Sequence, residues 1–307
     1  MSNAKKHFAP RTTPARHRSE ERLGAHVSIR GGIDLAPARG TAIGATAIQV
    51  FTKTPNQWRD PEIDRQTGHA FREAYQRCGL RGLVAHDSYL INLASPDEAL
   101  RHRSIGSFVA ELERCDRLGI PAVVSHPGNY IDERDAGLER NAEACTRALE
   151  QAESDVMVLF ETTAGSGTAL GRTFEELAAL RDSIPTSLQS RIGFCADTCH
   201  LYAAGYDLVE AYDAVWERFD RIVGLEHLQC LHLNDSKTPF ASHRDRHELI
   251  GDGSLGAEPF RRVMRDPRFV NVVKVLETPK GEDEVTNDRR MLRRLRAYAR
   301  PVSRRHR

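Results

Sequence analysis

The chain has 307 residues, of which 40% are apolar and 28% charged, and its formal net charge is +1. This balance is typical of a soluble globular protein with a sizeable core, and it excludes a strongly acidic chain and one that attracts polyanions through its overall charge. No apolar run approaches the ~20 residues of a membrane span, and the N-terminus lacks the apolar segment of a secretion signal. We therefore expect a cytoplasmic protein with no membrane partner.

Both ends of the chain are basic. Residues 1–21 contain little apolar sequence and five lysines and arginines, and residues 289–307 contain nine arginines and no acid. We predict a disordered basic tail over residues 1–21 and a second basic tail over 300–307, which leaves residues 22–299 as one domain. The tails are either solubilising or weakly attracted to a polyanion, and the sequence leaves both roles open.

Eight short β-rich runs follow in chain order, at residues 23–29, 47–53, 82–88, 122–128, 156–163, 192–198, 228–235 and 272–278. Between them, apolar residues recur at helical spacing over residues 64–79, 97–118, 134–153, 173–183, 207–222 and 284–299. Short apolar strands that alternate with helices predict a parallel sheet, and eight units in about 280 residues fit an α/β fold of the (β/α)8 TIM barrel type. A doubly wound open sheet is the competing fold, but no Gly-rich phosphate loop follows the first strand.

Six consecutive predicted strands end in a side chain that can bind a metal ion. These side chains are His86, His126, Glu161, Asp197, His232 and Glu277, and three more lie just beyond strands, namely His200, Asp245 and His247. One histidine at a strand end is more often a hydrogen-bonded core residue, but six such ends in succession favour a metal site. Because the C-terminal ends of barrel strands converge on one face, we expect all nine side chains to share one pocket.

The chemistry of these donors indicates which ions they bind. Imidazole and carboxylate without thiolate suit zinc or manganese, and nine ligands are too many for one ion and about right for three. Clustered divalent ions are typical of phosphodiester hydrolysis. Cys195 and Cys199 are four residues apart, but one such pair is weak evidence for a zinc site, and the six cysteines suit reduced core positions.

Nine segments of the sequence resemble those of the endonuclease IV family of apurinic/apyrimidinic endonucleases. They run in the family's order from about residue 23 to 281, and they are "GAHVSIRGG", "FTKTPNQW", "HDSYLINLA", "SHPGNY", "LFETTAGSGTALG", "CADTCHLYAAGYD", "LHLNDSK", "RDRHELIGDGSLG" and "LETPKG". The resemblance implies a TIM barrel with three zinc ions, for which manganese is a possible substitute. It selects the same nine positions as the strand ends do.

By motif position, the resemblance also implies a role for each candidate ligand. His86 and His126 would hold the first zinc, and Glu161 would bridge it to the second. Asp197, His232 and Glu277 would complete the second site, and His200, Asp245 and His247 would hold the third. The neighbouring cysteines Cys195 and Cys199 would then be bystanders.

The implied substrate is duplex DNA with an abasic site. Hydroxide formed at the zinc cluster would attack the phosphorus 5′ to the lesion, leaving a 3′-hydroxyl and a 5′-deoxyribose phosphate, and trimming of blocked 3′ ends is also implied. Tyr89 and Leu90 match the family's wedge residues, which would fill the gap left by the exposed nucleotide. Ordinary loop packing is the alternative role for these two residues. A monomer is the simplest assembly for an enzyme that wraps DNA.

The sequence departs from the family pattern at a few positions that are not ligands. Asn56 stands where the family often has an arginine, which puts insertion by that loop in doubt. Tyr130 stands where a His or another polar residue is frequent, and Thr162 where Asn is common. His26 and His243 should lie near the site face without binding metal.

Two other functions remain open. A sugar isomerase or epimerase on the same barrel would need only about four ligands, for which Glu161, Asp197, His232 and Glu277 suffice, and the other five candidates argue against it. A catalytically inactive metal- or DNA-binding protein would be expected to lack a ligand, and every position is filled.

Overall fold

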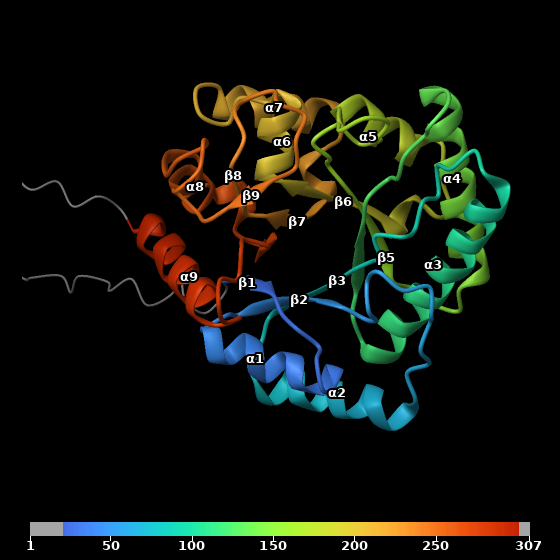
Figure 1. Cartoon of the computed structure of the whole chain (residues 1–307), viewed down its shortest axis with the longest axis horizontal. Helices are drawn as coiled ribbons and strands as arrows, with labels where there is room; N and C mark the ends of the chain where they lie inside the picture. The colour runs from blue at the N-terminus through green and yellow to red at the C-terminus, as the bar shows by residue number, and fades with distance from the viewer. Residues whose placement is uncertain (1–20, 301–307) are drawn as a thin grey trace, which may run out of the picture.

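The computed structural model describes residues 21–300, and the part described is a closed barrel of eight parallel strands (Figure 1). Each barrel strand pairs in parallel with both neighbours, in the spatial order β1, β10, β7, β6, β5, β4, β3, β2. The barrel strands are β1 Leu23–His26, β2 Ala47–Phe51, β3 Gly82–His86, β4 Ala122–Ser125, β5 Met157–Glu161, β6 Ile192–Asp197, β7 Leu228–His232 and β10 Val273–Leu276. The predicted fold is therefore confirmed.

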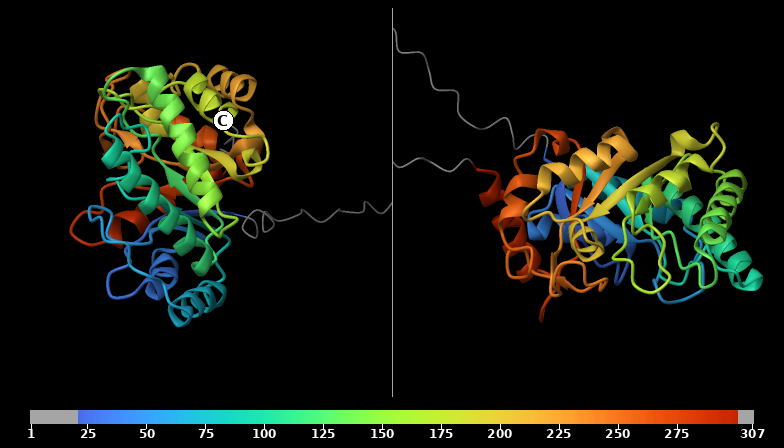
Figure 2. Two further views of the ribbon diagram at one scale, coloured as in Figure 1. Left: turned by 90° about the vertical axis from the view of Figure 1, so that its right-hand side faces the viewer. Right: turned by 90° about the horizontal axis from the view of Figure 1, so that it is seen from above.

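Nine α-helices connect or flank the strands within the described residues. They are α1 Ala36–Ile43, α2 Arg65–Arg77, α3 Glu98–Leu118, α4 Arg134–Gln151, α5 Phe174–Asp182, α6 Thr198–Ala204, α7 Tyr212–Ile222, α8 Glu258–Val263 and α9 Thr286–Ala299. Helices α3 and α4 pack side by side, as the teal and green ribbons show in Figure 1 and in the left view of Figure 2. None of the helices in residues 21–300 is long and apolar enough to cross a membrane.

Helices α2, α3 and α5 begin where the sequence places capping residues. Asp64, Asp97 and Thr173 each precede a helix, and each side chain accepts a hydrogen bond from a backbone N–H in the first turn. Gly119 ends α3 in the left-handed conformation, with φ of 71°, which an L side chain rarely adopts. These signals explain why the predicted bounds of α2, α3 and α5 agree with the structure to within two residues.

Other predicted bounds differ from the structure. Most strands are shorter than predicted, and His126 and Glu277 lie one residue beyond the ends of β4 and β10. The predicted helix 207–222 begins only at Tyr212, and α1, α6, α8 and a two-stranded hairpin, β8 Asp235–Ser236 with β9 His247–Glu248, were not predicted. These missed elements are at most eight residues long, which is too short for a periodic pattern.

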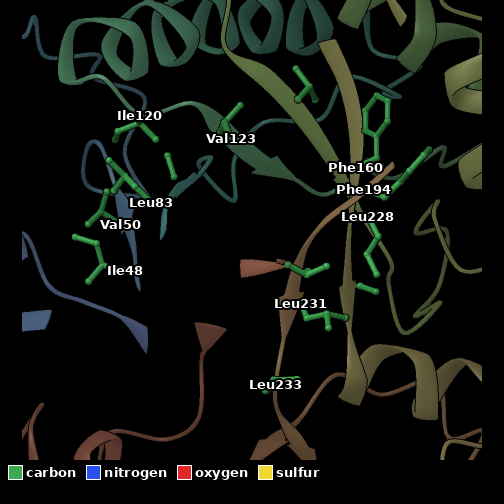
Figure 3. Packing of buried hydrophobic residues seen from close by; sticks show 14 of the residues in the cluster. Ile48, Val50, Leu83, Ile120, Val123, Phe160, Phe194, Leu228, Leu231 and Leu233 are labelled. Atoms are coloured by element: carbon green, nitrogen blue, oxygen red, sulfur yellow. The ribbon is translucent and has the colours of Figure 1, made fainter. Parts of the chain in front are cut away.

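Apolar side chains fill two layers. The larger layer lies between the strands and the surrounding helices and includes Val50, Val123, Phe160 and Phe194, which Figure 3 labels with their neighbours. A smaller cluster is formed by alternate strand residues that include Val84, Val124, Leu159, Cys195, Cys230 and Val275. Since successive strand residues face opposite sides, the smaller cluster fills the barrel interior, and the residues two positions further along point to the same side.

The predicted tails fall almost wholly on residues 1–20 and 301–307, which lie outside the described residues. Glu21, the last residue of the predicted N-terminal tail, is described, and its Oε2 accepts hydrogen bonds from Arg296 Nε at 2.9 Å and Nη2 at 2.7 Å. At the other end, the carbonyl oxygen of Arg300 accepts a hydrogen bond from Arg265 at 2.8 Å.

Candidate metal centre

Six candidate ligands lie at the C-terminal ends of six neighbouring barrel strands. His86, Glu161, Asp197 and His232 are the last residues of β3, β5, β6 and β7, and His126 and Glu277 follow β4 and β10 directly. Each stands two residues after a member of the smaller apolar cluster, so strand alternation turns it into the barrel mouth. The structure therefore brings these six side chains together on one face, as the sequence indicates.

Glu161 is the centre of this group. Its carboxylate is fully buried and four imidazoles surround it: His86 Nε2 at 3.2 Å, His126 Nε2 at 3.0 Å, His200 Nδ1 at 3.3 Å and His232 Nδ1 at 2.9 Å. Burial alone would raise the pKa of Glu161, but the charges of His232 and His126 outweigh it and hold that pKa well below its usual range. Glu161 is thus held ionised among side chains that can all act as metal ligands.

The same kind of contact raises the pKa values of histidines in the site, His86 and His247 among them. Burial would lower the pKa of His86, but its hydrogen bond to Glu161 and the charge of Glu161 raise it to about 9. Similarly, burial opposes protonation of His247, while the charge of Asp197 and the contact with Asp245 raise its pKa to about 9. The acidic groups therefore draw positive charge into the barrel mouth.

The nine candidates form three groups in which the ligand atoms lie within 4.8 Å of one another. The groups are His86, His126 and Glu161; Glu161, Asp197, His232 and Glu277; and His200, Asp245 and His247. Glu161 belongs to two of them. The structure also groups Cys195 and Cys230 with His232, and Cys199 with Asp197 and His247. Within the described residues, Cys195 and Cys199 belong to two different groups and never to the same one.

The third group contains buried nitrogen atoms without a hydrogen-bond partner. Nε2 of His200 and Nε2 of His247 are both buried, and each lies 3.2 Å from an oxygen of Asp245 without hydrogen-bond geometry. Leaving such atoms unpaired costs about 1–3 kcal/mol each. Two imidazole nitrogens and a carboxylate around one point are donors that suit a divalent cation, so the residues present fit a metal ion at this position.

Asp197 connects β6 to the helix that carries His200. Its Oδ1 accepts hydrogen bonds from the backbone N–H groups of Cys199 at 2.6 Å and His200 at 3.0 Å, which caps the seven-residue helix α6. Its Oδ2 accepts from the Asn234 amide at 2.6 Å. The opening of α6 at Asp197 explains how Asp197 and His200, three residues apart, enter different groups.

The hairpin β8–β9 brings Asp245 and His247 over the barrel mouth. Asp235 fixes this segment by accepting four backbone hydrogen bonds at 2.8–3.0 Å, from Ser236, Gly251, Gly253 and Leu255. A Cβ on Gly253 would lie 2.5 Å from Asp235 Oδ1, which requires glycine there. The backbone N–H of Ser254 also donates to the carbonyl of Ser236 at 2.8 Å, so the two ends of the segment touch.

The predicted wedge residues lie beside the first group. Tyr89 is 65% exposed, and its ring centroid lies 5.3 Å from that of Phe51 and 6.0 Å from that of His86. Leu90 is half-buried, and Asn56 is exposed on the neighbouring loop. That loop is joined to Tyr89's own loop by a hydrogen bond from Ser88 Oγ to the carbonyl of Pro55 at 2.5 Å.

Two further histidines and two amides complete the surroundings. His26 lies 3.7 Å from Glu277, whereas His243 bonds the carbonyl of Ala164 and belongs to none of the donor groups found in the described chain. Sequence reasoning missed the role of Asn234, which also accepts from the backbone N–H of Glu277 at 2.9 Å, and it missed Gln49. The signal for Gln49 is a lone amide within the apolar run "AIQVF".

The fold and the site together define a class of protein, namely TIM barrels that carry imidazole and carboxylate metal ligands at the C-terminal ends of their strands. In agreement, the model of the AP endonuclease 2 family, described as a xylose isomerase-like TIM barrel, matches residues 38–295. A probable endonuclease 4 of Geobacter sulfurreducens is 49% identical over 266 residues, which are 85% of this chain and 89% of the relative. The chain belongs to the endonuclease IV family of apurinic/apyrimidinic endonucleases.

Solved structures agree with this assignment. Endonuclease IV from Thermus thermophilus superposes with a TM-score of 0.81 at 38% identity, covering 91% of this chain and 98% of that one. D-Psicose 3-epimerase from Clostridium cellulolyticum superposes with a TM-score of 0.62 at 14% identity, covering 91% of this chain and 96% of that one. The likeness to the epimerase shows the shared fold alone.

Proposed function

We propose that this protein is a metal-dependent endonuclease of DNA repair that hydrolyses the phosphodiester bond 5′ to abasic sites in duplex DNA. The products are a 3′-hydroxyl and a 5′-deoxyribose phosphate, and the same site trims blocked 3′ ends. The observation that carries the proposal is the set of three donor groups at one barrel mouth, two of which share Glu161. Membership in the endonuclease IV family supports the substrate.

The cofactors proposed are three zinc ions, with manganese as a possible substitute. His86, His126 and Glu161 would hold the first, Glu161, Asp197, His232 and Glu277 the second, and His200, Asp245 and His247 the third. Divalent ions supply hydroxide near neutral pH and neutralise charge on phosphate oxygens. The buried Nε2 atoms of His200 and His247 support the third site, since neither has a hydrogen-bond partner in the described chain.

The chain's own residues have two tasks in this proposal. Glu161 is the catalytic residue that joins the first two donor groups, and its complete burial keeps it fixed between β3 and β7. Tyr89 and Leu90 enter the duplex at the lesion, and the exposed ring of Tyr89 supports that role. Exposing a nucleotide costs a few kcal/mol, which is lowest at a damaged site, and an apolar wedge offsets part of it.

A sugar isomerase or epimerase is the alternative function. It would require Glu161, Asp197, His232 and Glu277, which do form one group. The further five candidates lie in two additional groups around the same mouth, and a single-group enzyme leaves them without a purpose. For the endonuclease we propose a monomer that works in the cytoplasm and on the nucleoid when bound to DNA.

The test is cleavage of a labelled duplex that carries one tetrahydrofuran abasic analogue, with zinc supplied and no added magnesium. Wild type and Glu161→Gln are compared with Glu226→Gln, a matched change far from the barrel mouth, on the 3-10 helix Leu225–His227. We expect a cut immediately 5′ to the analogue by wild type and the control, and none by Glu161→Gln. An intact duplex after incubation with zinc-loaded wild type contradicts the proposal and would direct the search to sugar substrates.

A further inference from the structure

Gln49 is a buried amide inside the barrel, between the apolar interior of β2 and the candidate ligands. It stands two residues after Ala47, a member of the smaller apolar cluster, so its side chain points toward the barrel axis. Its exposed fraction is 0%. A fully buried amide must find partners for both its oxygen and its nitrogen, or it costs free energy.

The partners of Gln49 are two candidate ligands and a second histidine, His26. His232 Nε2 lies 2.8 Å from Gln49 Oε1, and Gln49 Nε2 lies 2.6 Å from Glu277 Oε1. Gln49 Nε2 also lies 3.0 Å from His26 Nδ1. One amide therefore connects side chains from β1, β7 and the end of β10.

The chemistry of these partners fixes the direction of each hydrogen bond. The ionised Glu277 can only accept, so the amide nitrogen must face it and the amide oxygen must face His232. Because an amide oxygen only accepts, Nε2 of His232 must carry a hydrogen. In a neutral imidazole this leaves Nδ1 of His232 as the atom with the lone pair.

The remaining nitrogen of His232 points into the second donor group. Nδ1 lies 2.9 Å from Glu161 Oε1 and 3.2 Å from Glu277 Oε2. A lone pair directed at two carboxylates is unfavourable unless a positive charge lies among them. The tautomer that Gln49 selects is therefore the one in which His232 can bind a cation together with both acids.

We propose that Gln49 is a positioning residue that selects the metal-binding tautomer of His232 and at the same time orients Glu277. This inference rests on the proposed function, because it assigns Gln49 to the second zinc site. Histidine ligands of metals generally donate their other ring N–H to an oxygen acceptor, and loss of that acceptor lowers metal affinity about 10- to 100-fold. Here one side chain supports two ligands.

Two substitutions separate the two contacts. Gln49→Met keeps most of the volume and removes both hydrogen bonds, so the N–H of His232 and one oxygen of Glu277 lose their amide partner. Gln49→Glu keeps an acceptor for His232 but sets a second carboxylate against Glu277. The matched control is Gln229→Met on β7, an exposed glutamine whose amide donates to the carbonyl of Glu226 at 3.1 Å.

The first measurement is the zinc content and zinc affinity of each purified full-length variant, by metal analysis after dialysis against buffers of fixed free zinc. For Gln49→Met we expect one zinc ion to bind about 10- to 100-fold more weakly, with the remaining zinc retained. Cleavage should then lose kcat at limiting zinc and recover in excess zinc, while KM for the duplex stays unchanged. Gln229→Met should match the wild type throughout.

The second measurement reads the tautomer directly. In protein labelled with ¹⁵N-histidine and loaded with zinc, the wild-type His232 should show a hydrogen on Nε2, and Gln49→Glu should preserve that signal. Unchanged zinc affinity in Gln49→Met, with the wild-type tautomer, overturns the inference. If the wild type itself binds no zinc or leaves the abasic duplex intact, the proposed function fails instead, so the two failures are distinguishable.

Discussion

Glu161 and His232 are 71 residues apart in the chain, and the Oε1 atom of one lies 2.9 Å from the Nδ1 atom of the other. The contact exists because Glu161 ends β5 and His232 ends β7, and β6 is the only strand between these two in the barrel order. The same order places every strand-borne candidate ligand within one or two strands of another. The barrel, rather than any local motif, builds the candidate site.

Removal of metal should lower the stability of the protein. Each ion that binds only the folded chain stabilises it by about 4 kcal/mol when its concentration is 1,000 times Kd. We expect a lower Tm by calorimetry after dialysis with a zinc chelator, and recovery on adding zinc. Glu161→Gln, which weakens two donor groups, should show a smaller difference. A wild-type Tm that does not respond to chelation would contradict the zinc proposal.

Substitution of Tyr89 should weaken DNA binding without affecting the fold. The ring is 65% exposed, so Tyr89→Ala removes little packing, but loss of aromatic stacking typically costs about 1–3 kcal/mol per base. We expect affinity for an abasic duplex, measured by fluorescence anisotropy, to fall about 10- to 100-fold with unchanged zinc content. Tyr89→Phe keeps the ring and should bind like wild type. Equal affinity of Tyr89→Ala would favour ordinary loop packing.

A buried ion-pair network holds the loop after β2 against α3. Arg114 donates to Glu111 at 2.6 Å, to Thr52 at 2.8 Å and to Asp60 at 3.1 Å, and Lys53 also reaches Asp60 at 2.8 Å. Arg114 and Glu111 are both almost completely buried. The network therefore fixes the loop that carries Asn56 beside the barrel mouth.

Breaking this network should strongly destabilise the protein. Arg114→Met leaves Glu111 buried without its main partner, and removal of one member of a buried pair costs about 3–5 kcal/mol. Urea unfolding should report this loss. Arg117→Met on the same helix breaks an ion pair to Glu62 whose side chains are 44% and 82% exposed, so it should cost less than about 1 kcal/mol. Equal effects of the two changes would refute the assignment.

Lys274 should make stability depend on pH in the alkaline range. Burial lowers its pKa from 10.5 to about 8, and its ammonium bonds the carbonyls of Phe269 and Val272. Between pH 8 and 10.5 the unfolded chain binds a proton that the folded chain does not, so the free energy of unfolding rises with pH across this window. Below pH 8 Lys274 is charged in the folded protein as well, so burial of the charged amine lowers the free energy of unfolding by up to about 3 kcal/mol.

The measurement is urea unfolding at several pH values for wild type and Lys274→Met. The variant lacks the titrating amine, so the wild type should gain stability relative to it by up to about 3 kcal/mol as pH rises through the window. Lys237→Met, at a side chain that is 50% exposed, is the matched control and should follow the wild type. A constant difference between wild type and Lys274→Met would show that the buried amine stays charged.

Much of this molecule could be predicted from the sequence, because barrel strands are short, apolar and regularly spaced. The ends of β3, β5, β6 and β7 agree with the predicted positions of His86, Glu161, Asp197 and His232. The sequence predicts the three residues of the third donor group, but it does not predict the hairpin segment that brings two of them to the barrel mouth. The hairpin β8–β9 has two residues in each strand and no apolar alternation, so only its pairing in space reveals it.

Gln49 shows a different limit of the sequence. One amide in an apolar strand predicts a polar contact, but two of its partners come from positions 183 and 228 residues further along the chain. Only the strand order of the closed barrel makes them neighbours. Asn234 was missed for the same reason, since it links Asp197 and Glu277 through contacts that no spacing encodes.

The closed segment between Ser236 and Ser254 has a consequence for the divergence of this barrel. Because its ends already touch through a backbone hydrogen bond, the segment can be shortened or exchanged without reopening the barrel. Such an exchange removes Asp245 and His247 while the strand-borne group of Glu161, Asp197, His232 and Glu277 stays in place. A single replaceable excursion of the chain therefore carries two of the nine donors, and its loss would leave seven donors at the mouth, with His200 the one member of the third group still in place.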